Sequence, residues 1–390
     1  MKKLSSLILA VCAGLCISTP GAAYDTTAEQ AIILDYDTGT VLYSLNAETP
    51  MTPASMTKIM TAYMVFERLA DGRLQPTDTF TVSERAWREG GWASGGSTMG
   101  LAIDEEVSVI DLLHGVIVQS GNDACIVLAE GIAGSEAAFA DLMSARAQEL
   151  GLTTAEFHNA TGLFSEGHEI SAHDLARLAR LTIENFPQYY DLYSVPSFEW
   201  SGIRQPNRNP LLSRFEGADG LKTGHLSISG YGLVGSAVED GVRRIVVING
   251  LENETERARE AERIMRAAFR EFSIASLYTT GEAITNVPVW LGSETSVSAR
   301  TSSEVTIAYE SAARGRLTAS LVLPGTVTAP VQSGQELGYL EISDGERVLG
   351  TFPIEAGEDV PRAGLFSRAL EGLSQLLVPG SETSSSEESA

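Results

Sequence analysis

The fold of this chain is decided by the stretch ASMTKIMT at residues 54–61, in which a hydroxyl and an amine stand three positions apart. Pro53 precedes it, where the first turn of a helix tolerates proline, and apolar residues recur at helical spacing from Met56 to Met64. These features predict a helix that begins near Ser55. Because residues i and i+3 of a helix share one face, we expect the amine of Lys58 to reach the hydroxyl of Ser55.

Lysine is used sparingly in this chain. Beyond Lys2 and Lys3 only Lys58 and Lys222 occur, beside 23 arginines. Arginine stays protonated in proteins, whereas a buried lysine can lose its proton, and a helix N-terminus disfavours an ammonium there. Lys58 is therefore a candidate general base and Ser55 a candidate nucleophile, although a serine near a helix start is also an ordinary cap.

Two further motifs bring polar side chains to the ends of apolar segments. SGN at residues 120–122 stands between two apolar helical patterns, so a hydroxyl and an amide can face one cleft, and the same tripeptide is also common in turns. KTG at residues 222–224 comes before two predicted strands, 232–237 and 244–248. An ammonium and a hydroxyl on a strand edge suit a carboxylate, and glycine lets a substrate backbone lie close.

The three motifs follow one another in the order and spacing of the acyl-serine signature of penicillin-recognising enzymes. With them, and with NRN at residues 207–209 and DGLKTGH at residues 219–225, the sequence resembles the low-molecular-mass penicillin-binding proteins of the D-alanyl-D-alanine carboxypeptidase family. The resemblance covers about residues 28–275, and residues 329–338 resemble the family's C-terminal β domain. Leu226, where many members have threonine, departs from the pattern at the rim of the site.

The resemblance implies a reaction and a role for each motif. Ser55 would attack the carbonyl between the two terminal D-alanines of a peptidoglycan stem, Lys58 would take its proton, and Ser120 would relay a proton to the leaving amine. Water would then release the acyl-enzyme, and β-lactam antibiotics would acylate the same serine. The substrate-binding residues that the resemblance implies are Asn122, Lys222, Thr223, Gly224, His225 and Arg257.

Within that set, the backbone N–H groups of Ser55 and His225 would hold the oxyanion, and Lys222 with Thr223 would bind the terminal carboxylate. Arg257 would lie near the same carboxylate, although a surface charge on its helix is an equal reading. No metal or other cofactor is implied, and the five histidines lack the spacing of a zinc site.

The composition and the N-terminal sequence limit the partners and the cellular location of the protein. A formal charge of −24 leaves no basic surface for nucleic acid. Residues 1–23 have the order of a secretory signal, so we expect export to the periplasm, after which Cys125 remains as a buried packing residue without a disulfide partner.

These patterns and the resemblance divide the sequence into five parts. We expect a signal peptide at 1–23, an α+β catalytic domain at 24–277 and an all-β sandwich at 278–360. The resemblance implies that the α+β domain has the penicillin-binding protein and serine β-lactamase fold, an antiparallel sheet flanked by helices with a helical subdomain. An amphipathic helix at 361–379 resembles the family's membrane-surface anchor, or packs on the β domain, and an acidic disordered tail fills 380–390.

Three other functions stay open at this point. A class A β-lactamase needs a glutamate in a Glu-x-x-Leu-Asn context, and the residues after Glu166 do not fit. A D,D-endopeptidase could use the same site on cross-linked stems. A non-catalytic cell-wall-binding protein could keep the fold, and the intact serines and lysines of the motifs weigh against it.

Overall fold

The structure is a computed structural model that describes residues 24–345 and 347–364. The predicted signal peptide and acidic tail lie outside these residues. Of the helix predicted at 361–379, only residues 361–364 are described, and they are not helical, because Arg362 instead pairs with Gly292 in an isolated β-bridge.

An antiparallel sheet forms the centre of the N-terminal domain. Its strand order is β2 (Val41–Leu45), β1 (Gln30–Asp35), β11 (Val242–Leu251), β10 (Gly230–Glu239) and β9 (Ala218–Leu226). Side chains alternate across it, so that Ile32 and Leu34 enter one core while Ala31 and Ile33 enter another. Both faces of the sheet are therefore buried, and β9 with its KTG sequence is left at an edge.

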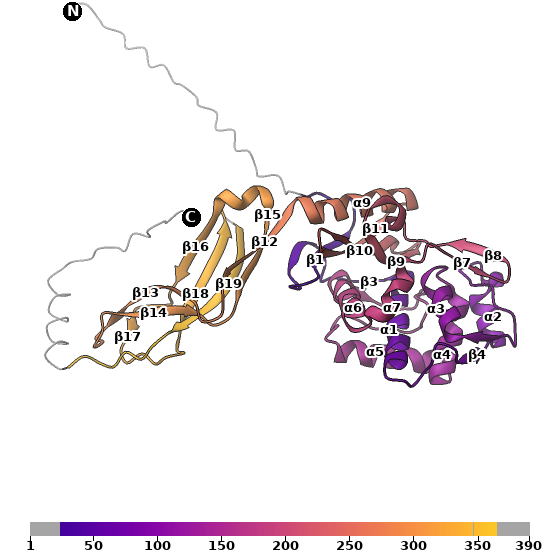
Figure 1. Cartoon of the computed structure of the whole chain (residues 1–390), viewed down its shortest axis with the longest axis horizontal. Helices are drawn as coiled ribbons and strands as arrows, with labels where there is room; N and C mark the ends of the chain where they lie inside the picture. The colour runs from indigo at the N-terminus through magenta and orange to yellow at the C-terminus, as the bar shows by residue number, and fades with distance from the viewer. Residues whose placement is uncertain (1–23, 346, 365–390) are drawn as a thin grey trace, which may run out of the picture.

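Helices cover both faces of this sheet, as Figure 1 shows. On one face α9 (Glu254–Arg270) packs its apolar stripe, which includes Ile264 and Met265, against β10 and β11. On the other face lie α1 (Lys58–Ala70) and α6 (Ala172–Asn185). The fold of this domain is thus α+β, as the sequence predicted.

A helical region continues from the second face and carries much of the larger core. Its helices are α2 (Glu84–Gly90), α3 (Val109–Ile117), α4 (Asn122–Ala133), α5 (Glu136–Glu149) and α7 (Pro187–Tyr190). The short helix α8 (Leu211–Arg214) lies instead on the face covered by α9, because its Leu211 belongs to that core. Short strand pairs brace it, namely β3 (Pro50–Met51) with β6 (Ile170–Ser171), β4 (Thr79–Thr81) with β5 (Glu106–Ser108), and β7 (Ser197–Trp200) with β8 (Ile203–Pro206). Several helices begin where a side chain caps the first turn, at Ser83, Ser108, Ser135, Ser171 and Asn253.

The C-terminal domain is all-β, as predicted. One sheet has the order β16 (Leu317–Val322), β18 (Glu336–Asp344), β19 (Arg347–Ala356), β14 (Ser296–Thr301), β13 (Ala283–Trp290) and β17 (Val327–Thr328). A second pair joins β12 (Phe272–Tyr278) to β15 (Val305–Glu310). Valines, leucines and isoleucines from both sheets form their own core, separate from those of the first domain.

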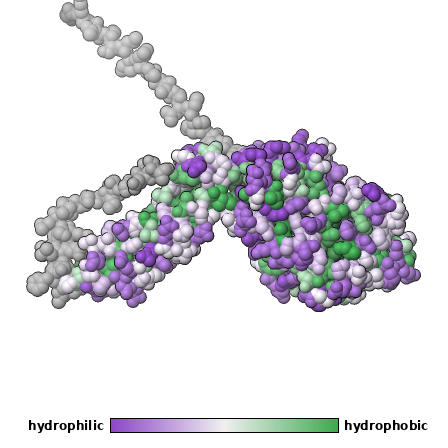
Figure 2. Space-filling view, viewed as in Figure 1, coloured by the Kyte–Doolittle hydropathy of each residue, from purple (hydrophilic) through white to green (hydrophobic). Residues whose placement is uncertain are grey.

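The surface of both domains is largely polar, and hydrophilic residues dominate the face drawn in Figure 2. Across residues 24–345 and 347–364, no helix combines the length and the apolar character that crossing a bilayer requires.

Candidate active site

Ser55 and Lys58 meet at the start of the first long helix. Ser55 lies in a short 3-10 turn, η1 (Ala54–Thr57), and Lys58 is the first residue of α1. The Nζ of Lys58 lies 2.9 Å from the Oγ of Ser55. The expected contact is present, with a tighter turn at the serine than a regular α-helix would give.

The amine of Lys58 is buried, with 1% of the residue exposed. Burial is the main reason that the pKa of Lys58 lies below its ordinary value. Besides Ser55, the amine contacts Asn122 Oδ1 at 2.8 Å and the Thr161 carbonyl oxygen at 2.5 Å.

These three neighbours suit a neutral amine. The carbonyl oxygens of Asn122 and Thr161 can only accept, so they take the two N–H groups of an uncharged Lys58. When Lys58 is uncharged, its remaining lone pair is available to the hydroxyl of Ser55, whereas the protonated amine donates to the Ser55 Oγ. Within the part of the chain that the structure describes, no carboxylate hydrogen-bonds this amine to hold it as a cation.

Ser120 stands between α3 and α4 in a left-handed backbone conformation, with φ of +60°. Ala54, next to Ser55, has φ of +50°. Such conformations are costly for residues with a side chain and concentrate at functional sites. They aim Ser120 at β9, where its Oγ accepts a hydrogen bond from Lys222 Nζ at 2.9 Å.

Lys222 is buried on strand β9, with 2% exposed. Burial first, then the positive charges of Lys58 and Arg208, hold the pKa of Lys222 well below its ordinary value. Lys222 therefore lies in the interior of the protein and not at an exposed strand end. Thr223, Gly224 and His225 follow along the same strand and line one cleft with Ser55.

Strand β9 reaches η1, the turn that holds Ser55, because residue 224 is glycine. A Cβ added there would lie 2.6 Å from the Pro53 carbonyl oxygen, closer than real Cβ atoms approach such an atom. The absence of a side chain thus lets β9 pack against η1.

Arg257 and His225 close the same side of the cleft around one aromatic ring. The His225 ring stacks on Tyr231 at 3.8 Å, and the Arg257 guanidinium lies 5.5 Å from the Tyr231 centroid. Arg257 is 5% exposed, and its burial lowers its pKa. The alternative reading of Arg257 as a surface charge is therefore wrong, because α9 turns it inward toward the cleft.

The cleft has a volume of about 480 Å³. It is lined by Ser55, Gly95, Gly96, Ser97, Ser120, Asn122, Gly162, Leu163, Arg208, Thr223, Gly224, His225, Leu226, Tyr231, Glu254 and Arg257. All predicted site residues line this cleft except the two lysines, whose amines reach it from below through Ser55 and Ser120. Leu226 lies on its wall, as expected for a departure at the rim.

Sequence reasoning missed Arg208, whose Nε donates to the Gln119 carbonyl oxygen at 3.1 Å, and the Thr161 carbonyl. The NRN sequence at 207–209 was quoted for its resemblance and given no role, and a backbone carbonyl has no residue type to signal it. Cys125 is buried and its pKa is raised to about 12, in line with a packing role. In the described ranges, His, Cys, Asp and Glu form no group that could hold a metal ion.

A serine hydroxyl against a buried amine, a second serine against a second lysine, and an edge strand beside them define an acyl-serine enzyme of the penicillin-recognising class. The sequence profile of the D-alanyl-D-alanine carboxypeptidase family matches residues 17–253, and that of the penicillin-binding protein 5 C-terminal domain matches residues 272–362. The chain belongs to the D-alanyl-D-alanine carboxypeptidase family. It is a serine-type enzyme that removes the terminal D-alanine from peptidoglycan pentapeptide stems through an acyl-serine intermediate.

Individual relatives are similar to this chain in sequence or structure along most of its length. The carboxypeptidase DacC of Escherichia coli is 36% identical over 383 residues, covering 94% of this chain and 96% of the relative. The crystal structure of DacD from Francisella tularensis has a TM-score of 0.78 at 28% identity, covering 88% and 95%. Penicillin-binding protein D2 of Listeria monocytogenes, solved with cefotaxime bound, has a TM-score of 0.56 at 27% identity, covering 62% and 97%. The family, fold class and reaction predicted from three motifs are confirmed, and the alternative functions are not favoured.

Proposed function

We propose that Ser55 is the nucleophile of this carboxypeptidase and Lys58 its general base. The Ser55 hydroxyl gives its proton to the lone pair of Lys58 as its oxygen forms a bond to the carbonyl carbon of the penultimate D-alanine. Ser120 then relays the proton taken up by Lys58 to the nitrogen of the terminal D-alanine as that C–N bond breaks, so Lys58 becomes neutral again and Ser120 keeps a proton. Water then hydrolyses the ester and restores Ser55.

Lys222, Thr223 and Arg257 bind the terminal carboxylate in this proposal. In the free enzyme Lys222 is buried beside other cations, which lowers its pKa. An arriving carboxylate favours the charged amine, so substrate binding restores the ammonium that then holds it. The Arg257 Nε, which has no hydrogen-bond partner among the described atoms, is a further donor for this group.

The acyl side and the developing oxyanion use the remaining residues. Asn122 holds the amide of the stem peptide with its side chain, while its Oδ1 orients Lys58. The backbone N–H groups of Ser55 and His225 receive the oxyanion, and Gly224 gives the peptide room along β9.

One observation carries these roles, namely the Nζ of a buried Lys58 at 2.9 Å from the Oγ of Ser55, with two carbonyl oxygens in contact with the same nitrogen. The Ser55→Ala variant tests it. We expect D-alanine release from a pentapeptide ending in D-Ala-D-Ala to fall by about 10³-fold or more, because the nucleophilic oxygen is gone. Mass spectrometry after penicillin exposure is expected to detect an adduct on the parent and none on the variant.

The exposed Ser213, outside the cleft, provides the matched control, and Ser213→Ala is expected to keep both activities. A penicillin adduct that survives in Ser55→Ala would remove Ser55 from the mechanism. A parent that hydrolyses penicillin rapidly and leaves no lasting adduct would instead favour the β-lactamase alternative.

We also propose that the protein is exported and touches a membrane surface through its C-terminal segment. The support is the signal-like sequence at residues 1–23 and the apolar spacing from Leu365 to Leu377. Both segments lie outside the described residues. Deletion of the C-terminal segment tests the membrane contact.

A further inference from the structure

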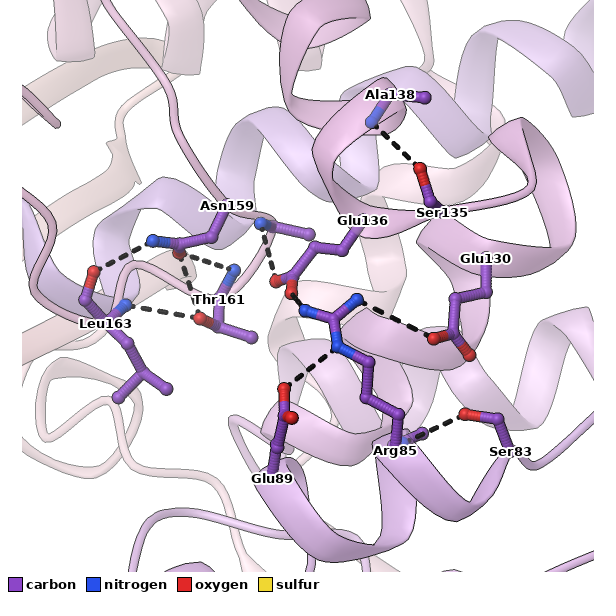
Figure 3. Close-up of polar contacts among 12 residues, drawn as sticks. Ser83, Arg85, Glu89, Glu130, Ser135, Glu136, Ala138, Asn159, Thr161 and Leu163 are labelled. Atoms are coloured by element: carbon purple, nitrogen blue, oxygen red, sulfur yellow. Dashed lines mark hydrogen bonds and ion pairs between the residues drawn. The ribbon is translucent and has the colours of Figure 1, made fainter.

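An arginine outside the cleft forms ion pairs with three carboxylates from three helices. Arg85 of α2 contacts Glu89 at 2.9 Å, Glu130 at 3.7 Å and Glu136 at 2.6 Å, as Figure 3 shows. The side chains of Arg85 and Glu89 are 40% and 44% exposed, whereas that of Glu136 is only 8% exposed. A carboxylate that far from water needs more than one partner.

The second partner of Glu136 is a backbone group that leads to the active site. Its Oε1 accepts a hydrogen bond from the Ala160 N–H at 3.1 Å. The carbonyl of Ala160 accepts one from the Thr61 hydroxyl of α1 at 2.7 Å. Residue 160 is therefore held on both of its peptide groups, by α5 on one side and by α1 on the other.

The 159–163 segment that follows is folded tightly around Asn159. The Oδ1 of Asn159 accepts from the N–H groups of Thr161 and Gly162 and from the Thr161 hydroxyl. Its Nδ2 donates to the Leu163 carbonyl at 2.9 Å (Figure 3). The segment is thus braced by its own hydrogen bonds, and Ala160 ties it to α5 and α1.

The segment packs directly on the nucleophile turn. Gly162 has φ of +77°, and a Cβ there would lie 1.9 Å from the Ala54 carbonyl oxygen. One residue earlier, the Thr161 carbonyl accepts from Lys58 Nζ at 2.5 Å. A shift of the segment would therefore move the acceptor that fixes one hydrogen of the catalytic amine.

We propose that Glu136, held by Arg85, is a positioning residue for Lys58. Through Ala160 it fixes the 159–163 segment so that the Thr161 carbonyl takes one N–H of the amine and the lone pair stays directed at Ser55. This inference rests on the roles of Ser55 and Lys58 proposed above. It assigns to the Arg85–Glu136 pair a part in catalysis that neither residue could have by contact with substrate.

The charge of Glu136 acts on the same amine from a distance. Its carboxylate raises the pKa of Lys58, against the larger lowering caused by burial. The other ionisable groups whose charges act on this amine are Asp123, Cys125, His168, Arg208 and Lys222. Removing the negative charge of Glu136 while keeping its shape is therefore expected to extend activity to lower pH, since Lys58 stays neutral there.

The experiment compares Glu136→Ala and Glu136→Gln with two matched controls, Glu89→Gln and Glu130→Gln. The controls remove a carboxylate from the same guanidinium but leave Ala160 untouched. The acylation rate constant is measured with a fluorescent penicillin, per titrated active site and over a range of pH, beside KM and kcat for a pentapeptide and the thermal midpoint. Counting active sites separates positioning from folding, because a structural defect lowers the number of sites rather than the rate at each.

For Glu136→Ala we expect the acylation rate per site to fall about tenfold or more, with KM within about twofold, because an ill-directed amine slows the proton transfer. Glu136→Gln is expected to keep more of the rate and to move the acid limb of its pH profile to lower pH. Both controls are expected to stay within about twofold of the parent, and Arg85→Lys, which keeps a cation, to retain more activity than Arg85→Ala.

An unchanged rate per site in Glu136→Ala overturns the proposal, as does an equal loss in Glu89→Gln. If Glu136→Ala does not fold, Glu136→Gln decides, and an acid limb at the parent's pH overturns it. A parent that penicillin does not acylate at Ser55 refutes the proposed function instead, whereas an acylated parent with unaltered variants refutes only the positioning role.

Discussion

Two buried lysines with lowered pKa values stand on either side of the reacting atoms. In the proposed mechanism, Lys58 has to be neutral to accept the proton of Ser55, and Lys222 has to be charged to hold a carboxylate. Burial lowers the pKa of both, and the charge of Lys58 lowers the pKa of Lys222 further. The proposed mechanism therefore requires opposite protonation states of two similar buried amines.

These demands predict a bell-shaped pH dependence of kcat/KM for a pentapeptide, with both limbs below the ordinary pKa of lysine. The proposed mechanism needs Lys58 neutral and Lys222 charged, so activity falls at both ends of the pH range, and the two limbs are properties of the coupled pair. Lys222→Arg keeps a cation at every pH in the range and is expected to abolish the basic limb while retaining the acid limb. A basic limb at the same pH in that variant would contradict the assignment of Lys222.

His168 lies behind the nucleophile turn and is buried. Its Nδ1 accepts a hydrogen bond from the His158 N–H at 3.1 Å, so its Nε2 carries the proton and donates to the Thr57 hydroxyl at 2.8 Å. Burial is the main cause that lowers the pKa of His168 to about 4 from the ordinary 6.5. The folded protein thus keeps this ring neutral where the unfolded chain would protonate it.

A stability prediction follows from that difference. As pH falls from about 6.5 to about 4 the unfolded chain binds the proton first, so the free energy of unfolding falls by up to about 3 kcal/mol through His168. Thermal midpoints measured across this range are expected to drop less steeply in His168→Gln than in the parent. His173→Gln, at a half-buried histidine, is the control substitution. Parallel slopes in parent and His168→Gln would contradict the prediction.

At this scale the sequence predicts residues that carry a recognisable side-chain chemistry and misses those that act by position. Ser55, Lys58 and Lys222 were found from their types and spacing. The Thr161 carbonyl was not, because every residue has one, and its contact with Lys58 spans 103 positions of the chain. The link from Arg85 to Glu136 spans 51 positions and leaves no local pattern.

At the scale of elements, the site exists because strand β9, turn η1 and the loop before α4 meet. Strand β9 comes close to η1 at the place where Gly224 faces the Pro53 carbonyl. The strand also presents Lys222 and Thr223, so its distance from Ser55 fixes where a bound carboxylate sits relative to the nucleophile.

Gly224→Ala is therefore expected to push β9 away from η1 and to reduce both acylation by penicillin and D-alanine release by about tenfold or more. The control is Gly315→Ala, where an added Cβ meets nothing within 4 Å and the backbone is not left-handed. Active-site titration with penicillin followed over time measures the effect. Equal acylation rates in the two variants would contradict the close packing of β9 against η1.

Elements with a regular apolar pattern were predicted, and short or half-exposed ones were not. The strands predicted at 232–237 and 244–248 are present as β10 (Gly230–Glu239) and β11 (Val242–Leu251), since each carries a continuous run of buried residues. Helix α2 has only two buried residues, and β19 alternates weakly because most of it is partly exposed. The hairpin of β7 and β8 was missed for the same reason, as none of its residues is fully buried.

The whole molecule combines a catalytic domain, an all-β domain and a strongly acidic charge. Without residues 1–23 it has 25 basic and 51 acidic residues, which gives long-range repulsion from anionic lipid. The C-terminal segment from residue 365 offers only Arg368 as a cation, beside Glu371 and an acidic tail. Any membrane contact through it must therefore come from apolar side chains.

This balance predicts an unusual salt response for membrane binding. Attachment to vesicles with anionic lipid is expected to survive or strengthen as salt rises, because salt screens the repulsion and leaves apolar burial intact. Deleting residues 365–390 is expected to move the protein into the soluble fraction without changing D-alanine release. The deletion keeps Arg362 and Ala363, which hydrogen-bond the backbone of the β domain at Ala329 and Leu291. Release from vesicles by high salt would indicate electrostatic attachment, and a truncated protein that stays bound would place the membrane contact elsewhere on the molecule.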